Sequence, residues 1–195
     1  MGDEKSQIRK NFLLKRKKLY NKTVRFTFDD IYKLIKLNFK NKKITVAGYY
    51  PINFEVNTLN FMLKLFKKKI NLALPIITKN YGMLFKKWTP GESMYLNKYG
   101  IPEPSKSCKT VIPDVILVPL VAFDKNLNRL GYGAGYYDRV LKKISLKNKV
   151  FCIGIAFSFQ KYSNIPINKN DYALDCILTE QKIIDKRNNE NFIFR

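Results

Sequence analysis

VILVPLVAF at residues 115–123 and DKNLNRLGYGAGYYDR at residues 124–139 form the stretch of sequence that decides the fold. The first run is strongly apolar, which predicts a strand buried on both faces of a sheet. Glycines then alternate at positions 131, 133 and 135, and the residues after them predict a helix of about ten residues. A buried strand, a glycine-rich loop and a helix in this order predict an α/β unit whose loop approaches a ligand.

Strands and helices alternate on both sides of this unit. Helical spacing predicts a basic helix over residues 5–20 and two further helices, with Thr27 and Thr58 as their N-terminal caps. Residues 89–113 contain four of the eight prolines and are interpreted as a long loop region. Apolar, β-rich runs predict an edge strand at residues 83–88 and further strands at residues 44–50, 70–77, 150–157 and 176–179.

The spacing of apolar residues predicts which helix faces are buried. In the first helix these residues are Ile8, Phe12 and Leu19. In the helix after Thr58 the expected buried stripe is Leu59, Met62, Leu63 and Phe66. Together the elements predict an α/β fold: a single three-layer domain over residues 1–195, with a mainly parallel central sheet flanked by helices.

The composition excludes several kinds of chemistry. Histidine is absent, which rules out a Ser–His–Asp triad, a Cys–His pair and an HExxH zinc site. The cysteines, Cys108, Cys152 and Cys176, form no CxxC pair, so a zinc cluster or a disulfide framework is not expected. No apolar run approaches the roughly 20 residues that span a bilayer, and the charged N-terminus lacks the apolar core of a secretory signal. We expect a cytoplasmic protein with no membrane partner.

The formal net charge of +22 has two interpretations. Lysine supplies 30 of the 37 basic residues, and Asn, Ile, Phe and Tyr are also common. AT-rich codons encode these same residues, so the charge is interpreted mainly as a composition bias spread over the solvated surface. The dense basic patch LLKRKKLYNK at residues 13–22 leaves an alternative open, because lysine and arginine attract phosphate without sequence preference. The alternative is a basic RNA- or ribosome-associated binding protein.

The glycine-rich loop has the residues that an anion site needs. Glycine accepts positive φ angles and a close ligand, and the amides at the start of the next helix would point at phosphate. Arg129 and Arg139 could add charge-assisted contacts, and Asp138 could hold a magnesium ion. No GK[ST] follows the loop, so it is not a Walker A motif, and it does not match GxGxxG. On the glycines alone, a plain turn with a capping aspartate remains an alternative.

RLGYGAGYYDR at residues 129–139 closely resembles the signature of the 5-formyltetrahydrofolate cyclo-ligase family, also called methenyltetrahydrofolate synthetase. The resemblance covers nearly the whole chain, with three departures. Asn170 stands where relatives often carry His, and Ala134 stands where some carry Lys. Tyr99 aligns with a position that can be Trp. Further similar segments occur in the same order and spacing: KSQIRK (5–10), AGYYPINFEVNT (47–58), YGIPEP (99–104), PDVILVPLVAFD (113–124) and INKNDYALDCILTE (167–180).

The resemblance implies an enzyme that uses ATP and Mg²⁺ to close 5-formyltetrahydrofolate to 5,10-methenyltetrahydrofolate, releasing ADP and phosphate. We expect a monomer. It implies catalytic roles for Arg129 and Asp138, and magnesium binding by Asp138 and Asp171, with Asp175 as a rival. The implied folate-binding residues are Tyr50, Glu55 and Tyr99. The implied ATP-binding residues are Lys5, Arg9, Arg129, Leu130, Gly131, Tyr132, Gly133, Ala134, Gly135, Tyr136 and Tyr137.

Simpler roles remain open for several of these residues. Lys5 and Arg9 could be solvated helix charges, and Glu55 could be an exposed loop acid. Tyr50 and Tyr99 could pack at a surface edge, and Asp171 could cap a turn. A relative that keeps the nucleotide site but has lost folate chemistry is a further alternative for the whole protein.

Overall fold

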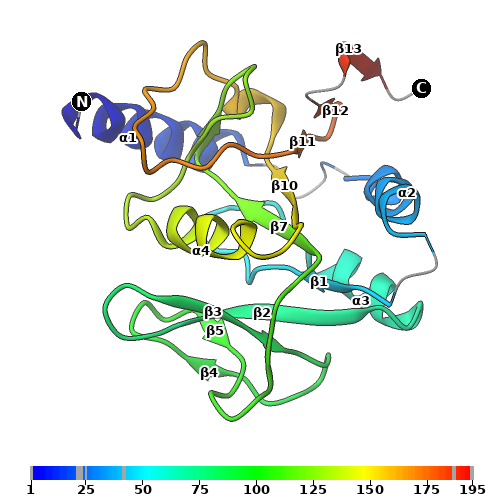
Figure 1. Cartoon of the computed structure of the whole chain (residues 1–195). Coiled ribbons are helices and arrows are strands. Elements are labelled where there is room, and N and C mark those ends of the chain that lie inside the picture. Colours follow the sequence, from blue (N-terminus) through cyan, green and yellow to red (C-terminus); the bar gives the residue numbers. More distant parts are fainter. Residues whose placement is uncertain (1, 21–23, 25, 41–42, 186–187, 194–195) are drawn as a thin grey trace.

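A computed structural model of the chain describes residues 2–20, 24, 26–40, 43–185 and 188–193. Within these residues nine strands form one sheet (Figure 1). In spatial order they are β13 (Asn188–Ile193), β12 (Lys182–Asp185), β11 (Cys176–Leu178), β10 (Phe151–Ile155), β7 (Val115–Pro119), β1 (Thr45–Ala47), β2 (Asn71–Ile77), β3 (Met83–Lys87) and β6 (Thr110–Val111).

The centre of the sheet is parallel and its two edges are antiparallel. β7 pairs in parallel with β10 on one side and with β1 on the other, and β11 and β2 extend this parallel block. Val115, Ile116, Leu117 and Val118 are each 0% exposed, as expected for a strand covered on both faces. The antiparallel strands β3 and β6 lie beyond β2, and β12 and β13 lie beyond β11. The predicted mainly parallel α/β sheet is confirmed.

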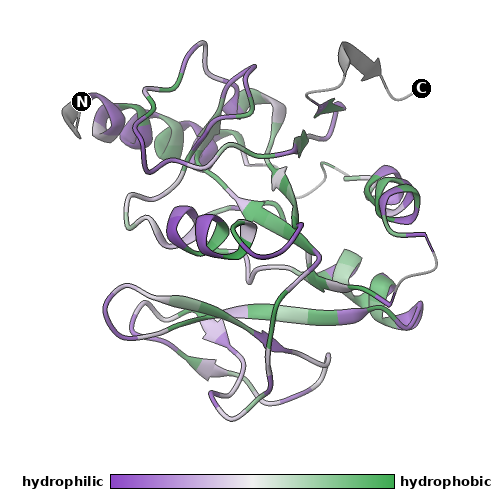
Figure 2. Cartoon of the chain, viewed as in Figure 1, coloured by the Kyte–Doolittle hydropathy of each residue, from purple (hydrophilic) through white to green (hydrophobic). Residues whose placement is uncertain are grey.

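Helices cover both faces of this sheet and make three layers. α2 (Asp29–Asn38) and α3 (Leu59–Lys67) pack on one face, and α4 (Tyr136–Ser145) packs on the other. The central strands are green in Figure 2, whereas α4 has purple solvent-facing turns and green residues toward the sheet. α1 (Gly2–Leu19) packs instead on the hairpin of β8 (Ala122–Phe123) and β9 (Arg129–Leu130), through Ile8 and Phe12.

The structure corrects several local predictions. Neither Thr27 nor Thr58 caps a helix through its side chain: Phe28 is the N-cap residue of α2, and the Thr58 hydroxyl donates to the carbonyl of Tyr49 instead. β3 is not the edge strand, because β6 pairs outside it. The region 89–113 is also less irregular than expected, since it forms β6 and the hairpin of β4 (Tyr95–Leu96) and β5 (Pro102–Glu103).

Two helix faces also differ from the prediction. In α3 the buried residues are Phe61, Met62 and Leu65, whereas Leu63 and Phe66 are exposed, because the sheet contacts a stripe one position away from the predicted one. In α1, Leu19 is 46% exposed and Arg16 is 1% exposed. Arg16 therefore continues the buried stripe of Ile8 and Phe12, where an apolar residue was expected.

None of the helices that the structure describes is long and apolar enough to cross a membrane.

Candidate active site

A cavity of about 1010 Å³ opens where the parallel strands of the sheet end. Pro119 at the end of β7 and Ile77 at the end of β2 line it, together with segments from α1, the 95–103 hairpin and the start of α4. Ligands of open α/β sheets bind in such a crevice, outside the carboxyl ends of the strands. Every residue proposed above for ATP, folate or catalysis, and both Asp138 and Asp171, lines this one cavity.

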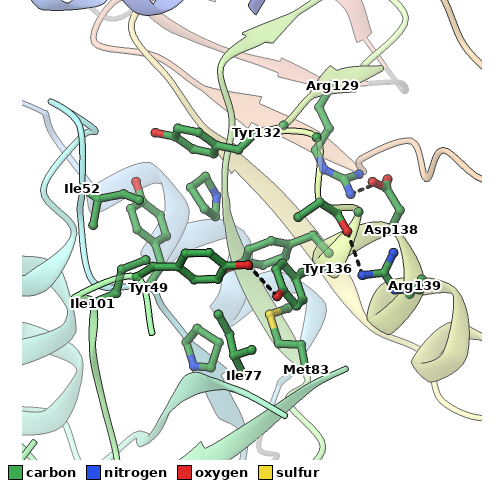
Figure 3. Close-up of a pocket in the computed structure, with 18 of the residues that line it drawn as sticks. Tyr49, Ile52, Ile77, Met83, Ile101, Arg129, Tyr132, Tyr136, Asp138 and Arg139 are labelled. Carbon is green, nitrogen blue, oxygen red and sulfur yellow. Dashed lines mark hydrogen bonds and ion pairs between the residues drawn. The ribbon is translucent and has the colours of Figure 1, made fainter. Parts of the chain in front are cut away.

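The cavity has an apolar side and a charged side (Figure 3). Tyr49, Ile52 and Ile101 lie at the left of the view, and Ile77 and Met83 lie below its centre. Arg129, Asp138 and Arg139 lie at the right, Tyr136 lies near the centre, and Tyr132 lies above Ile52 and Tyr49. Such a cavity can hold a flat, partly apolar ring next to an anionic group.

The glycine-rich loop depends on two of its three glycines for its backbone shape. Gly133 and Gly135 have φ angles of +104° and +66°, which side chains disfavour, whereas Gly131 does not adopt a positive φ. A Cβ at Gly133 would lie 3.4 Å from Cζ of Arg9, so the missing side chain also makes room for that guanidinium. Gly135 is the N-cap residue of α4, which places the amino end of the helix at the cavity.

Two basic residues of α1 bind the loops that surround the cavity. Lys5 forms an ion pair with Asp171 at 2.5 Å, and Nε of Arg9 donates to the carbonyl of Gly131 at 2.9 Å. One turn of helix separates these two residues, so both point from one face of α1 toward the cavity. Lys5 and Arg9 are therefore not merely solvated charges. Asp171 also accepts from the amide of Asn168 at 2.8 Å, so it closes a turn as well as pairing with Lys5.

Asp138 has a partner that the sequence did not identify. Its Oδ1 lies 2.6 Å from Nη2 of Arg129, and the side chain of Arg129 is only 3% exposed. The same oxygen accepts from the amide of Tyr172 at 3.1 Å, and Arg129 also donates to the carbonyl of Tyr172. The Arg129–Asp138 pair therefore ties the start of α4 to the segment before β11.

Glu55 is a buried acid. It is 5% exposed, which excludes the alternative of an exposed loop acid. Its carboxylate closes a tight turn by accepting from the amide of Ile52 at 2.9 Å, and Asn53 and Phe54 in that turn have φ angles of +46° and +61°. A bulky residue such as Phe at positive φ is strained, and such strain persists where the surroundings impose it. Burial raises the pKa of Glu55 to about 7.

A tyrosine hydroxyl holds the other oxygen of Glu55. Tyr132 donates to Oε1 of Glu55 at 2.9 Å, and Arg16 donates to the Tyr132 hydroxyl in turn. The Tyr132 ring is 38% exposed because it faces the cavity, but its hydroxyl is enclosed between these two partners. Burial raises the pKa of Tyr132, so this phenol stays neutral.

Three tyrosines meet at the rim of the cavity. The hydroxyls of Tyr99 and Tyr136 lie 3.1 Å apart, which joins the β4–β5 hairpin to the first residue of α4. The rings of Tyr81 and Tyr136 are 6.3 Å apart between centroids, and Arg139 donates to the carbonyl of Tyr81 at 2.8 Å. Tyr99 is 51% exposed and Tyr50 is 37% exposed. Both line the cavity.

The carboxylates of the cavity bear on the expected magnesium site. Among the described residues, no group of three or more Cys, Asp or Glu side chains is placed to hold a metal. One oxygen of Asp138 accepts from Arg129 and from the amide of Tyr172. One oxygen of Asp171 likewise accepts from Lys5 and from the amide of Asn168. A magnesium ion held by one or both of these carboxylates would take its other ligands from phosphate and water, which is how proteins usually bind Mg²⁺. Asp175 does not line the cavity, and its carboxylate accepts from the amide of Cys152 at 2.7 Å.

Comparison with known proteins identifies the family. The model of the 5-formyltetrahydrofolate cyclo-ligase family matches residues 1–180. The chain belongs to this family. Its membership makes it an enzyme of the ligase class.

Relatives agree with this membership. A 5-formyltetrahydrofolate cyclo-ligase from Mycoplasma genitalium is 33% identical over 179 residues, which cover 90% of this chain and 97% of that protein. One from Haemophilus influenzae is 37% identical over 141 residues, covering 68% and 74%. The solved structure of a 5,10-methenyltetrahydrofolate synthetase from Mycoplasma pneumoniae superimposes with a TM-score of 0.69 at 29% identity, covering 91% of this chain and 99% of that one.

Sequence reasoning missed some residues of this cyclo-ligase cavity. Tyr49 lines it and is 2% exposed, with its hydroxyl donating to the carbonyl of Val56 at 2.8 Å, but only its neighbour Tyr50 was singled out. Arg16 is connected to Glu55 although it does not itself line the cavity. Its position four residues after Phe12 and eight after Ile8, on the buried stripe, is the signal that could have identified it.

Proposed function

We propose that this chain closes 5-formyltetrahydrofolate to 5,10-methenyltetrahydrofolate, using ATP and Mg²⁺ and releasing ADP and phosphate. One observation carries the proposal. A single cavity combines a buried carboxylate among aromatic rings with a cation-lined, glycine-rich loop at the start of a helix. These two halves match a pterin and a polyphosphate, which must meet for this reaction.

The folate would occupy the aromatic side. Glu55 in its ionised form accepts hydrogen bonds, and the N–H groups of a pterin ring donate them. Tyr50 and Tyr99 would flank the ring, and Ile52 and Ile101 would supply apolar contact. With a pKa of about 7, Glu55 is ionised above neutral pH and increasingly protonated below it. Folate affinity is therefore expected to fall as the pH drops through 7.

The phosphates of ATP would occupy the charged side. Lys5, Arg9 and Arg129 contribute positive charge there, and the amides at the start of α4 contribute donors. The other members of the ATP-binding set are Leu130, Gly131, Tyr132, Gly133, Ala134, Gly135, Tyr136 and Tyr137. In this role Arg129 stabilises the charge that develops on the transferred phosphoryl group, while Asp138 fixes its guanidinium.

The chemistry requires positioning more than covalent catalysis. The formyl oxygen attacks the γ-phosphorus, so an O–P bond forms and the P–O bond to ADP breaks. The second folate nitrogen then attacks the formyl carbon, the C–O bond breaks, phosphate leaves and that nitrogen loses its proton. The protein holds the two substrates in line and excludes water. This explains how the reaction proceeds without any histidine.

Asp138 and Asp171 are the residues that would help hold Mg²⁺, each through the oxygen not engaged by Arg129 or Lys5. Bound there, the ion would neutralise charge on the transferring phosphate.

We expect the enzyme to act as a monomer in the cytoplasm.

The RNA-binding alternative is weaker than the sequence suggested. Its basic patch, residues 13–22, includes Arg16, which is 1% exposed and so cannot contact RNA. Residues 21 and 22 lie outside the described part of the chain. Lys15, Lys17 and Lys18 are exposed, but spread lysines favour weak binding without sequence preference.

The decisive experiment supplies purified protein with 5-formyltetrahydrofolate and Mg-ATP and follows the absorbance of the methenyl product. We expect product with one ADP released per turnover. A folded protein that forms no product where a known cyclo-ligase does would overturn the proposal. It would favour the alternative of a relative that binds nucleotide without folate chemistry.

A further inference from the structure

Arg16 is a buried cation in a position that packing alone would fill with an apolar side chain. It is 1% exposed and continues the stripe of Ile8 and Phe12 toward the core of the molecule. Its Nε has no hydrogen-bond partner among the described residues. A buried charge with an unsatisfied donor destabilises a fold unless it is paired. Its presence therefore calls for a role beyond packing.

The hydrogen bonds of Arg16 lead to the folate side of the cavity. Nη1 donates to the carbonyl of Leu120 at 3.0 Å, and Nη2 donates to the hydroxyl of Tyr132. That hydroxyl donates to Oε1 of Glu55 at 2.9 Å. The guanidinium also lies 5.7 Å from the centroid of the Tyr132 ring. A chain of two hydrogen bonds thus connects a buried cation to a buried carboxylate through one phenol.

We propose that Arg16 is a positioning residue of the folate site, which keeps Glu55 ionised and oriented through the hydroxyl of Tyr132. The inference rests on the proposed role of Glu55 in folate binding. It adds a residue that does not line the cavity. Figure 3 shows Tyr132 above Ile52 and Tyr49 in the cavity wall, and its hydroxyl accepts from Arg16 and donates to Glu55.

The surroundings of Glu55 leave Arg16 as the counter-charge. Among the residues that the structure describes, the titratable groups that face Glu55 are Tyr49 after β1, Tyr132 in the glycine-rich loop, Tyr137 in α4 and Arg16 in α1. Burial raises the pKa of all three tyrosines, so they are neutral near pH 7. Lys5 and Arg9 line the same cavity but direct their side chains to Asp171 and to Gly131.

Burial and Arg16 act on Glu55 in opposite directions. Burial raises the pKa of Glu55, whereas the amide of Ile52, the charge of Arg16 and the Tyr132 hydroxyl lower it, and the net value is about 7. Without Arg16 the carboxyl would be protonated at neutral pH, and a protonated carboxyl is a poorer acceptor for pterin N–H groups. Arg16 therefore sets the pH range in which the site accepts folate.

The anchoring of the Glu55 turn supports the same role. The ring of Tyr20, just beyond the end of α1, lies 5.3 Å from that of Phe54 between centroids. α1 thus touches the strained turn through Tyr20 and reaches the carboxylate through Arg16 and Tyr132. A shift of this helix would move the Glu55 turn and its counter-charge together.

The test follows the Glu55 carboxyl carbon by NMR in protein labelled with ¹³C-glutamate, without ligand, using Glu55→Gln for assignment. We expect a midpoint near pH 7 in the parent. In Arg16→Met the midpoint should rise by about one pH unit or more, because an opposite charge nearby shifts a carboxyl by about 1–3 units. Arg16→Lys keeps the charge and should restore part of the difference. Lys17→Met removes an exposed charge from the same helix and should leave the midpoint unchanged.

Folate binding provides the second readout. A rise of one unit lowers the ionised fraction of Glu55 at pH 7.5 from about three quarters to about one quarter, so affinity in Arg16→Met should fall about threefold. The affinity should recover at pH 9, which a merely structural defect would not allow. ATP affinity serves as the internal control and should fall less than folate affinity.

Several outcomes would overturn the inference. An unchanged midpoint in Arg16→Met would do so. If that variant does not fold, Tyr132→Phe breaks the relay while keeping Arg16, and an unchanged midpoint there is equally decisive. A shifted midpoint with no matching change in the pH dependence of folate affinity would also refute the role. Failure of the parent to bind folate at any pH would instead overturn the proposed function, and the ligand-free titration keeps the two failures distinct.

Discussion

Replacing Asp138 with Asn removes the charge that faces Arg129 while keeping nearly the same shape. Two unit charges about 4 Å apart attract by about 4 kcal/mol at an effective dielectric constant of about 20. Asp138 is 27% exposed, so solvent screens part of this attraction, and the Asn oxygen can still accept from Arg129 and from the amide of Tyr172. We therefore expect Asp138→Asn to lower the free energy of unfolding by about 2 kcal/mol, below the roughly 3–5 kcal/mol of a fully buried pair.

Thermal unfolding measures this loss directly. In a protein of this size, 1 kcal/mol corresponds to about 2–4 °C, so the melting temperature should fall by about 4–8 °C without ligand. Turnover of the folded fraction should also fall by at least about tenfold, because Arg129 and the proposed magnesium site both depend on this carboxylate. The two effects are separable when folded fraction and rate are measured on one preparation.

Asp30→Asn is the matched control. Asp30 pairs with Lys33 at 3.0 Å, but the Lys33 side chain is 72% exposed. Exposed pairs of this kind contribute about 0.5 kcal/mol or less. If Asp138→Asn lowers the melting temperature no more than Asp30→Asn does, the pairing of Arg129 with Asp138 is not a stabilising feature and the reasoning fails.

Four other predictions can be tested on the same protein. Glu55→Gln should weaken folate binding by about 1.5–3 kcal/mol and leave ATP binding nearly unchanged, as seen by titration calorimetry; equal loss for both ligands would contradict the assignment. Because burial raises the pKa of Glu55 from its ordinary 4.5 to about 7, the folded state binds more protons than the unfolded state between these values. Urea unfolding should show the parent losing on the order of 3 kcal/mol between pH 4.5 and 7, and Glu55→Gln should lack this loss. Gly154→Ala should destabilise by about 1–3 kcal/mol in the same assay, since its Cβ would lie 2.6 Å from Leu174 and 2.9 Å from Leu120; unchanged stability would mean that these side chains move aside freely. Binding to generic RNA should be weak and fall steeply with salt, and tight, salt-resistant, sequence-selective binding would favour the RNA-binding alternative.

The sequence by itself determined the layered α/β fold and many, though not all, of the residues that line the cavity. Val115–Val118 could be recognised as a doubly buried strand because an uninterrupted apolar run has few other uses in a small domain. The glycine-rich segment at 129–139 could be recognised because its backbone needs glycine at 133 and 135. This requirement is local, so it is visible in the amino-acid sequence itself. Local periodicity and local backbone demands are readable without knowing what packs against them.

Only the tertiary structure decided which charged groups of the site are buried and which groups they pair with. Glu55 and Tyr132 are 77 positions apart, and Arg16 and Tyr132 are 116 apart, so no local pattern links them. Whether an acid is buried, and which cation faces it, is set by the loops and helices that fold over it. The same dependence explains why the stripe of α3 was misjudged by one position and why Arg16 was missed. Helical spacing identifies the possible apolar faces of a helix, but the sheet that it packs on decides which face is buried. A buried arginine is tolerated where the fold places a counter-charge from a distant part of the chain near it.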